Sequence, residues 1–163
     1  MSASNERVAI VAGAGGELAR ATAEKLAAAG FTVVGVDRSE EGLKELPDGI
    51  RREAADPADP AAARSVVDRI AAEAGPPEVL VNTIGTYHLG EALTVTPEDL
   101  RLMIDVNVGA ALWLTQAVVP YLRERGSGSF VYVAAEAVAD IIVYLVSDAA
   151  APISGAVVPA YGA

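Results

Sequence analysis

The sequence predicts an α/β domain in which a mostly parallel sheet lies between two layers of helices. Short apolar runs alternate with longer alanine-rich segments along the chain, and this alternation is typical of strand–helix–strand units in a parallel sheet. A length of 163 residues suits one domain with its own core, and no repeat or low-complexity linker divides it. We therefore expect a single domain over residues 1–163.

Strands and helices follow from the apolar runs and the breakers between them. The expected strands cover residues 7–12, 31–36, 50–55, 79–84, 130–134 and 155–160. The expected helices cover residues 18–29, 39–46, 60–74, 97–125 and 138–146. The third strand contains Arg51-Arg52-Glu53 and is too polar for the centre of a sheet, so it is expected at an edge. The predicted strand order is 3-2-1-4-5 plus the terminal strand.

Helix-start and helix-stop residues support these boundaries. Gly30 stands where a left-handed residue would end the first helix. Asp59 and Thr96 each come directly before a proline, so they fit N-caps with proline in the first turn. The long fourth helix contains Pro120, which predicts a kink there.

Composition excludes several classes of protein. The 12 basic and 22 acidic side chains give a net charge of −10, which opposes binding to nucleic acid or to anionic membranes. The chain has no cysteine, so a disulfide scaffold or a zinc site built on thiolates is excluded, and we expect no metal. No apolar run approaches the roughly 20 residues of a membrane span, and the polar N-terminus does not resemble a signal peptide. We expect a cytoplasmic protein.

A glycine-rich loop, Gly13-Ala14-Gly15-Gly16, follows the first strand and opens the first helix. Such a loop lets backbone N–H groups approach a pyrophosphate at the positive end of a helix. Asp37 ends the second strand, 21 residues after Gly16, where a carboxylate accepts both ribose hydroxyls of NAD. The loop 13–19 has no basic residue for a 2′-phosphate, although Arg38 follows Asp37, so NAD is preferred over NADP. The alternative is that these glycines only form a tight turn.

Separated stretches of the chain resemble the short-chain dehydrogenase/reductase family. They are the glycine loop 13–20, Asp56 after the third strand, the segment Val81-Asn82-Thr83-Ile84-Gly85, the helix motif Asn107-Val108-Gly109-Ala110, and the terminal stretch 138–161. The loop departs from the family pattern, because Ala12 replaces a Thr, and Glu17 and Ala19 stand where later glycines are usual. A glutamate there would repel bound phosphates unless it points to solvent.

The resemblance implies a three-layer, Rossmann-like, doubly wound fold that binds a nicotinamide dinucleotide. It also implies hydride transfer between NAD and a small alcohol or carbonyl substrate. In this family Asp56 would contact the adenine ring and the segment 82–85 would pass the adenosine ribose. The residues expected at the cofactor are Gly13, Gly15, Gly16, Leu18, Asp37, Arg38, Asp56, Pro57, Asn82, Thr83, Ile84 and Gly85.

The family's catalytic tetrad of Asn, Ser, Tyr and Lys is implied to survive only as Asn107. The tetrad's Tyr and Lys stand four residues apart, but both lysines of this chain, Lys25 and Lys44, precede all five tyrosines. Alanines 134 and 135 occupy the position of the serine. The helix that should carry Tyr and Lys has no counterpart, which predicts an internal deletion near residues 137–140. The deletion is real in the gene product, engineered, or a segment left out of this sequence.

Other polar residues near the expected site each have two interpretations. His88 could be a general acid or base, or a solvated loop residue. Tyr87 could replace the missing hydroxyl, although it lacks a nearby lysine. Glu136 could face a ligand at a strand end, or act as a helix N-terminal acid. Asp105 and Asn107 could be polar groups on a helix surface.

The sequence therefore predicts an NAD-binding member of this family with little or no turnover. One alternative is a non-catalytic, self-associating or scaffold subunit, because the helix 97–125 is apolar on more than one face and would leave an exposed patch. The other is an active dehydrogenase, if the native protein contains the missing segment. Nucleic acid and membranes are not expected partners, whereas a homo-oligomer through the helix 97–125 is expected.

Overall fold

The structure is a computed structural model, and it describes residues 7–86 and 91–133. Its sheet has five parallel strands in the order β3-β2-β1-β4-β5, as the sequence predicted for this part of the chain. The strands are β1 (Val8–Ala12), β2 (Thr32–Asp37), β3 (Arg51–Ala54), β4 (Pro77–Asn82) and β5 (Ser129–Tyr132). The polar β3 lies at an edge, as expected. All carboxyl ends meet at one side of the sheet.

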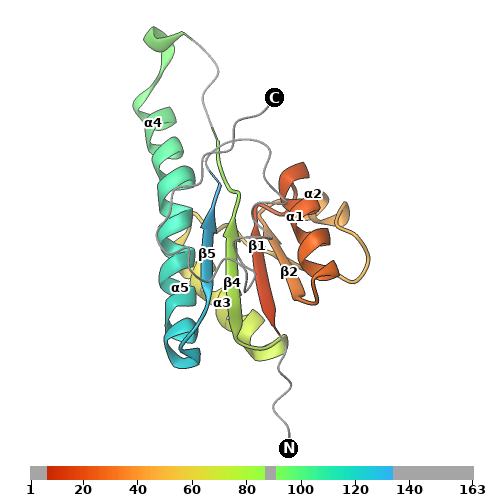
Figure 1. Cartoon of the computed structure of the whole chain (residues 1–163). Helices are drawn as coiled ribbons and strands as arrows, with labels where there is room; N and C mark the ends of the chain where they lie inside the picture. Colours follow the sequence, from red (N-terminus) through yellow and green to blue (C-terminus); the bar gives the residue numbers. More distant parts are fainter. Residues whose placement is uncertain (1–6, 87–90, 134–163) are drawn as a thin grey trace, which may run out of the picture.

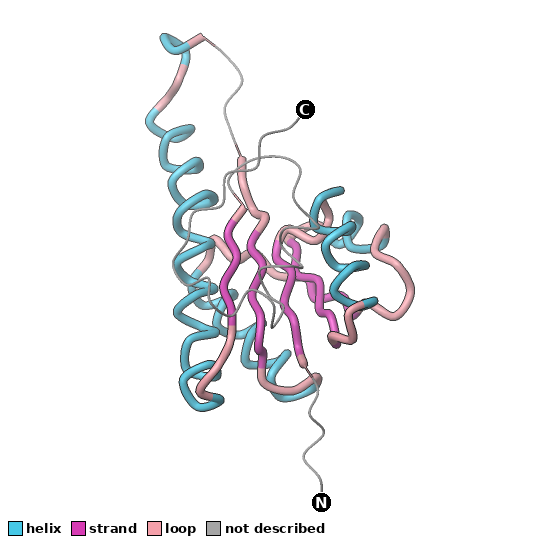
Figure 2. The backbone as a smooth tube through the Cα atoms, viewed as in Figure 1, coloured by secondary structure: helices cyan, strands magenta, loops and turns pink. Residues whose placement is uncertain are grey.

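Helices cover both faces of the sheet (Figures 1 and 2). Helices α1 (Glu17–Ala28) and α2 (Glu40–Lys44) lie on one face. Helices α3 (Pro60–Glu73) and α5 (Ala110–Arg125) lie on the other. The three-layer α/β arrangement that the sequence predicted is therefore confirmed.

The core has two halves because successive side chains of a buried strand point to opposite faces. In β1, Ala9 and Val11 pack against α1 and α2, whereas Val8 and Ile10 face α3 and α5. Every residue of β1 is fully buried. This strand is therefore the centre of the fold, and the loop that follows it starts from a rigid support.

The predicted caps position the helices. Asp59 accepts a hydrogen bond from the N–H of Ala62, and Thr96 forms a reciprocal capping box with Asp99. Gly30, just after the end of α1, has a φ of +89°, a conformation that favours glycine.

One long helical stretch leads from residue 97 to β5, but it is irregular at an unexpected place. Helix α4 (Pro97–Ile104) passes through a π-helical turn, η2 (Asp105–Gly109), before α5 begins. Pro120, where the sequence predicted a kink, lies inside α5, and the helix continues through that residue, so the kink itself stays a prediction. A short 3₁₀ turn, η1 (Ala92–Thr94), precedes α4.

Helix α4 extends past the carboxyl ends of β4 and β5 (Figure 1), and none of its residues is buried. The stretch Pro97–Arg125 is long and apolar enough to cross a membrane by length and composition alone, since a window of 18 residues within it has a mean hydropathy of 1.5. This finding corrects the expectation that no segment comes near these limits. The face of α5 that packs on the sheet accounts for part of this apolar composition, since Leu114 and Val118 are fully buried there.

Polar contacts fasten the outer helices and the amino ends of the strands. Tyr121 of α5 donates a hydrogen bond to Asp68 of α3 (2.8 Å). Burial raises the pKa of Asp68, but the hydrogen bonds from Tyr121 and Arg64 outweigh it, so that the pKa lies below its ordinary value.

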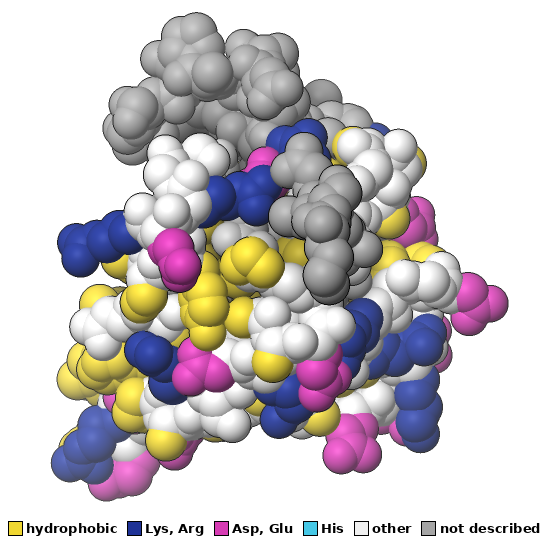
Figure 3. All heavy atoms as spheres, turned by 90° about the horizontal axis from the view of Figure 1, so that it is seen from below, with side chains coloured by type: hydrophobic (Ala, Val, Ile, Leu, Met, Phe, Trp, Pro, Cys, Tyr) yellow, Lys and Arg dark blue, Asp and Glu magenta, His cyan; other side chains and the backbone are white. Residues whose placement is uncertain are grey.

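At the amino ends of the strands, Glu78 accepts hydrogen bonds from Arg7 and Arg125, which joins β1, β4 and the end of α5. Charges of both signs lie among apolar side chains on this side of the molecule (Figure 3).

Several sequence-based expectations fall outside the described residues. They are the helix 138–146, the strand 155–160, the alanines 134 and 135, Tyr87, His88 and Glu136. The proposed deletion near residues 137–140 and the extent of the domain to residue 163 likewise stay predictions.

Two leucines of α5 give a matched test of the core. Leu114 is fully buried, so Leu114→Ala should lower the free energy of unfolding by about 2–5 kcal/mol. Leu112→Ala in the same helix should cost less than about 1 kcal/mol, because that side chain is 44% exposed. Urea unfolding followed by circular dichroism measures both, and equal losses would contradict the packing of α5 described above.

Candidate functional site

The loop after β1 makes a turn that only glycine fits. Gly13 has a φ of +83°, and a Cβ built on it would lie 2.6 Å from the hydroxyl of Thr83. The N–H groups of Gly13 and Ala14 both donate to the carbonyl of Val36 in β2 (2.9 and 3.1 Å). The loop is therefore held between the carboxyl ends of β2 and β4.

Asp37 ends β2, and backbone N–H groups hold its half-buried carboxylate. Its Oδ2 accepts a hydrogen bond from the N–H of Gly15 (2.9 Å), and its Oδ1 accepts one from the N–H of Ser39 (2.8 Å). Each carboxylate oxygen can accept a further hydrogen bond. The side chain is thus fixed in orientation while both oxygens can still receive donors from a ligand.

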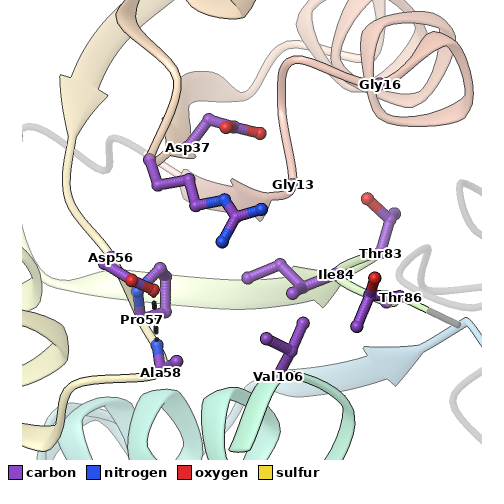
Figure 4. A pocket seen from close by; sticks show the side chains of 12 residues that line it. Gly13, Gly16, Asp37, Asp56, Pro57, Ala58, Thr83, Ile84, Thr86 and Val106 are labelled. Carbon is purple, nitrogen blue, oxygen red and sulfur yellow. Dashed lines mark hydrogen bonds between the residues drawn. The ribbon is translucent and has the colours of Figure 1, made fainter. Parts of the chain in front are cut away.

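A groove of about 280 Å³ runs over the carboxyl ends of β1, β2 and β4 (Figure 4). Most residues expected at the cofactor line it, namely Gly13, Gly16, Asp37, Arg38, Asp56, Pro57, Thr83, Ile84 and Gly85. Figure 4 shows Asp37 and Asp56 on one side of this groove and Ile84 across from them. Segments far apart in the sequence therefore meet where the motifs predicted.

Three expected residues are not among those that line the groove. Gly15 contributes through its N–H group, which orients Asp37. Leu18 lies in the first turn of α1, and its carbonyl accepts a hydrogen bond from Thr22. Asn82 is almost fully buried and accepts a hydrogen bond from the N–H of Ile84 (3.1 Å). Gly15 and Asn82 thus shape the backbone of the groove.

The groove also contains residues that the sequence did not single out: Ala58, Thr86 and Val106. The N–H of Ala58 donates to the carboxylate of Asp56 (3.0 Å), and an aspartate two residues before it is the usual sequence sign of such a turn. Thr86 directly follows the recognised segment 82–85. Val106 lies in the π-helical turn η2, and no sequence signal indicates that position.

A second cavity of about 490 Å³ adjoins the first. The two cavities share Ile84, Gly85 and Thr86, so they form one path along the end of β4. The second cavity is also lined by Asn82, Asn107, Ala111, Tyr132 and Val133. It therefore extends the groove toward the end of β5.

Asn107 connects the long helix to the loop after β4. Its amide group donates to the carbonyl of Thr86 (2.9 Å) and accepts from the N–H of the same residue (2.8 Å). Asn107 lies in η2, and π-helical turns occur frequently at functional sites. Asp105 is exposed and lines neither cavity.

The chemistry of the groove is compatible with a dinucleotide at most of its positions. Gly16 precedes α1 and gives it no side-chain cap, so the N–H groups of the first turn can face an anion. A diol can donate to the fixed carboxylate of Asp37. Glu17 is exposed in the first turn of α1, and its charge opposes a phosphate at that helix end.

Comparison with known proteins agrees with this geometry. A family model described as short chain dehydrogenase matches residues 7–151. The chain belongs to the short-chain dehydrogenase family. Proteins of this family are oxidoreductases that bind nicotinamide dinucleotides.

Individual relatives resemble the chain over four fifths of its length or slightly less. A short chain dehydrogenase of Pseudocercospora fijiensis is 38% identical over 137 residues, which are 78% of this chain and 44% of the relative. The short-chain reductase protein NovJ of Streptomyces niveus is 34% identical over 80% of this chain and 53% of its own length. The chain thus spans about half the length of the curated relatives it matches.

A solved structure shows the same fold. A short-chain dehydrogenase from Streptomyces avermitilis superposes with a TM-score of 0.71 at 36% identity, over 78% of this chain and 49% of that one. The Rossmann-like fold that the sequence predicted is therefore confirmed.

Two glycines of the loop test how tightly its backbone is constrained. Gly13→Ala should lower the free energy of unfolding by about 1–3 kcal/mol, because alanine is strained at positive φ and its Cβ would meet Thr83. Gly16→Ala should cost less than about 1 kcal/mol, since Gly16 has a φ of −84° and the nearest atom to its Cβ would be 3.3 Å away. Thermal and urea unfolding measure the difference, and the reverse order would contradict this geometry.

Proposed function

We propose that this chain binds NAD in the groove at the carboxyl ends of β1, β2 and β4. The observation that carries the proposal is the carboxylate of Asp37, which two backbone N–H groups hold at the tip of β2. In the proposed complex it accepts hydrogen bonds from both hydroxyls of the adenosine ribose. The pyrophosphate then lies against the loop 13–16, and the nicotinamide half extends toward the second cavity.

Charge near Asp37 favours NAD over NADP in this proposal. A 2′-phosphate would meet a carboxylate whose position is fixed by Gly15 and Ser39, and two like charges at that distance repel. Arg38 lines the groove beside Asp37 and is exposed, so it can stack on the adenine face. A cytoplasmic location agrees with the absence of cysteine and is part of the same proposal.

The proposal also includes little or no turnover by the 163-residue chain. Reduction of a carbonyl needs a hydroxyl that gives up a proton and a cation that lowers the pKa of that hydroxyl. No tyrosine of the sequence has a lysine four residues later. Asn107, the one tetrad residue retained, uses both polar atoms of its side chain on the backbone of Thr86, so it positions the loop. A native protein with a further segment would be an active dehydrogenase, and its intact mass would exceed 16.7 kDa.

Calorimetric titration tests the binding site. NADH should bind the unaltered chain, and Asp37→Asn should raise its Kd about 10-fold to 100-fold, because hydrogen bonds to a charged acceptor are weakened. Asp48→Asn is the matched control, since Asp48 is exposed in the loop before β3 and lies outside the groove. No heat at millimolar NAD or NADH would refute the binding proposal. A reductase rate that is lost only on changing Tyr87 or His88 would refute the proposed lack of turnover.

A second candidate function is that of a self-associating or scaffold subunit. Leu100, Ile104, Val108 and Leu112 repeat every four residues along α4, η2 and α5, and all four are between 44% and 60% exposed. Exposed apolar side chains at this spacing lie along one helical stretch, and such side chains can pack against another helix. This exposed apolar ridge fits a second copy of the chain or a longer member of the same family.

Sedimentation of the purified chain tests the exposed apolar ridge. The chain should form at least a dimer, and Ile104→Glu should shift it to monomer, because a charge in an apolar helix interface is costly. Leu93→Glu is the control, since Leu93 is 96% exposed but lies outside the ridge. A monomer at all concentrations, alone and mixed with a longer relative, would refute this function.

A further inference from the structure

Helix α2 packs on the glycine-rich loop through two glycines. A Cβ built on Gly42 of α2 would lie 3.0 Å from the Cα of Gly15. A Cβ built on Gly15 would lie 3.2 Å from the Cα of Gly42 and 3.1 Å from Oδ2 of Asp37. The two backbones therefore approach as closely as they do because neither residue has a side chain. Neither glycine is among the residues that line the groove.

The first turn of α2 also contacts Asp37. Ser39 caps this helix, since its hydroxyl accepts a hydrogen bond from the N–H of Gly42 (3.0 Å). The N–H of the same serine donates to Oδ1 of Asp37. One oxygen of Asp37 is thus held by the helix α2 and the other by the loop that α2 packs against.

The other end of α2 is anchored, so the helix cannot easily move away from the loop. Leu43 and Leu46 are almost fully buried in the core beside α1. Arg52 of β3 donates from its side chain to the carbonyls of both leucines. Gly35 of β2 leaves room for Leu46, because a Cβ there would lie 2.6 Å from its Cδ1.

We propose that Gly42 is a positioning residue that sets the carboxylate of Asp37 for a ribose with two free hydroxyls. The inference rests on the proposed NAD site and names a residue outside the groove that controls its selectivity. With α2 anchored at Leu43, Leu46 and Arg52, a side chain at position 42 displaces the loop at Gly15 by a few tenths of an ångström. That displacement weakens the hydrogen bond from Gly15 to Asp37.

Helix stability alone predicts the opposite effect. Alanine favours a helix more than glycine does, so Gly42→Ala would stabilise α2 if the contact with Gly15 were unimportant. Glycine in the first turn of this short helix is therefore explained by the close approach to Gly15 and not by the helix itself. A stabilised α2 in Gly42→Ala would support the first explanation, and a displaced loop at Gly15 would support the close approach.

The test compares NADH and NADPH binding, measured by nucleotide fluorescence, in three variants. Gly42→Ala should raise the Kd for NADH about tenfold, the size expected when one hydrogen bond to a charged group is weakened. The Kd for NADPH should change less, because its 2′-phosphate gains nothing from Asp37. Gly42→Val should raise the Kd for NADH further, because its side chain is larger. Glu41→Ala is the control, since Glu41 is exposed and pairs with Lys44 on the surface of the same helix.

A readout without nucleotide keeps this inference separate from the proposed function. Amide hydrogen exchange should show faster exchange at Gly15 in Gly42→Ala than in Glu41→Ala, while Leu26 and Ile10 in the core stay protected. Unchanged exchange at Gly15 would overturn the inference whether or not the chain binds NADH. So would an unchanged ratio of the two Kd values, or equal losses in the Glu41 variant. If the unaltered chain fails to bind NADH while exchange at Gly15 responds as expected, the proposed function fails and the positioning of Asp37 stands.

Discussion

The carboxyl ends of three strands meet at Gly13, which has a positive φ and, because it lacks a Cβ, leaves room for the hydroxyl of Thr83. The same turn directs two N–H groups to the carbonyl of Val36 at the end of β2. The loop that follows is then close enough for Gly15 to bond Asp37. The shape of the groove, the orientation of its carboxylate and the packing of α2 all depend on this one contact. A fully buried β1 supplies the rigidity that it needs.

The long helix contributes to the groove by a different means. Asn107 binds both backbone groups of Thr86, and the helix takes a π-helical turn at that residue. A turn with one extra residue moves the side chains before it out of register with those after it. The part after the turn packs on the sheet, whereas the part before it has no buried residue. One pair of hydrogen bonds therefore coincides with the change from core helix to exposed helix.

Short sequence patterns predicted those strands and site residues that depend on residues close together in the chain. The apolar runs indicated β1, β2, β4 and β5, and the polar residues of β3 indicated its position at an edge of the sheet. Asp37 was predicted as a site residue because a carboxylate at a strand tip follows a glycine loop at a known interval. The turn at Asp105–Gly109 was not predicted, because it involves a residue that is 21 positions away from its partner Thr86. The approach of Gly42 to Gly15 was missed for the same reason, since only the folded chain brings α2 to the loop.

The lack of burial along α4 has a consequence for how the molecule opens. Unfolding of a segment costs free energy in proportion to the contacts it breaks, and α4 breaks its own helical bonds and its Thr96–Asp99 cap but exposes no core residue. Helix α5 must separate from α3 and β4 before it can unfold, so its opening is coupled to that of the whole sheet. One continuous helical stretch is thus divided into two units of cooperativity, a terminal part that frays independently and a part that opens only with global unfolding. The boundary between these units falls at the turn η2, whose Asn107 lines the second cavity.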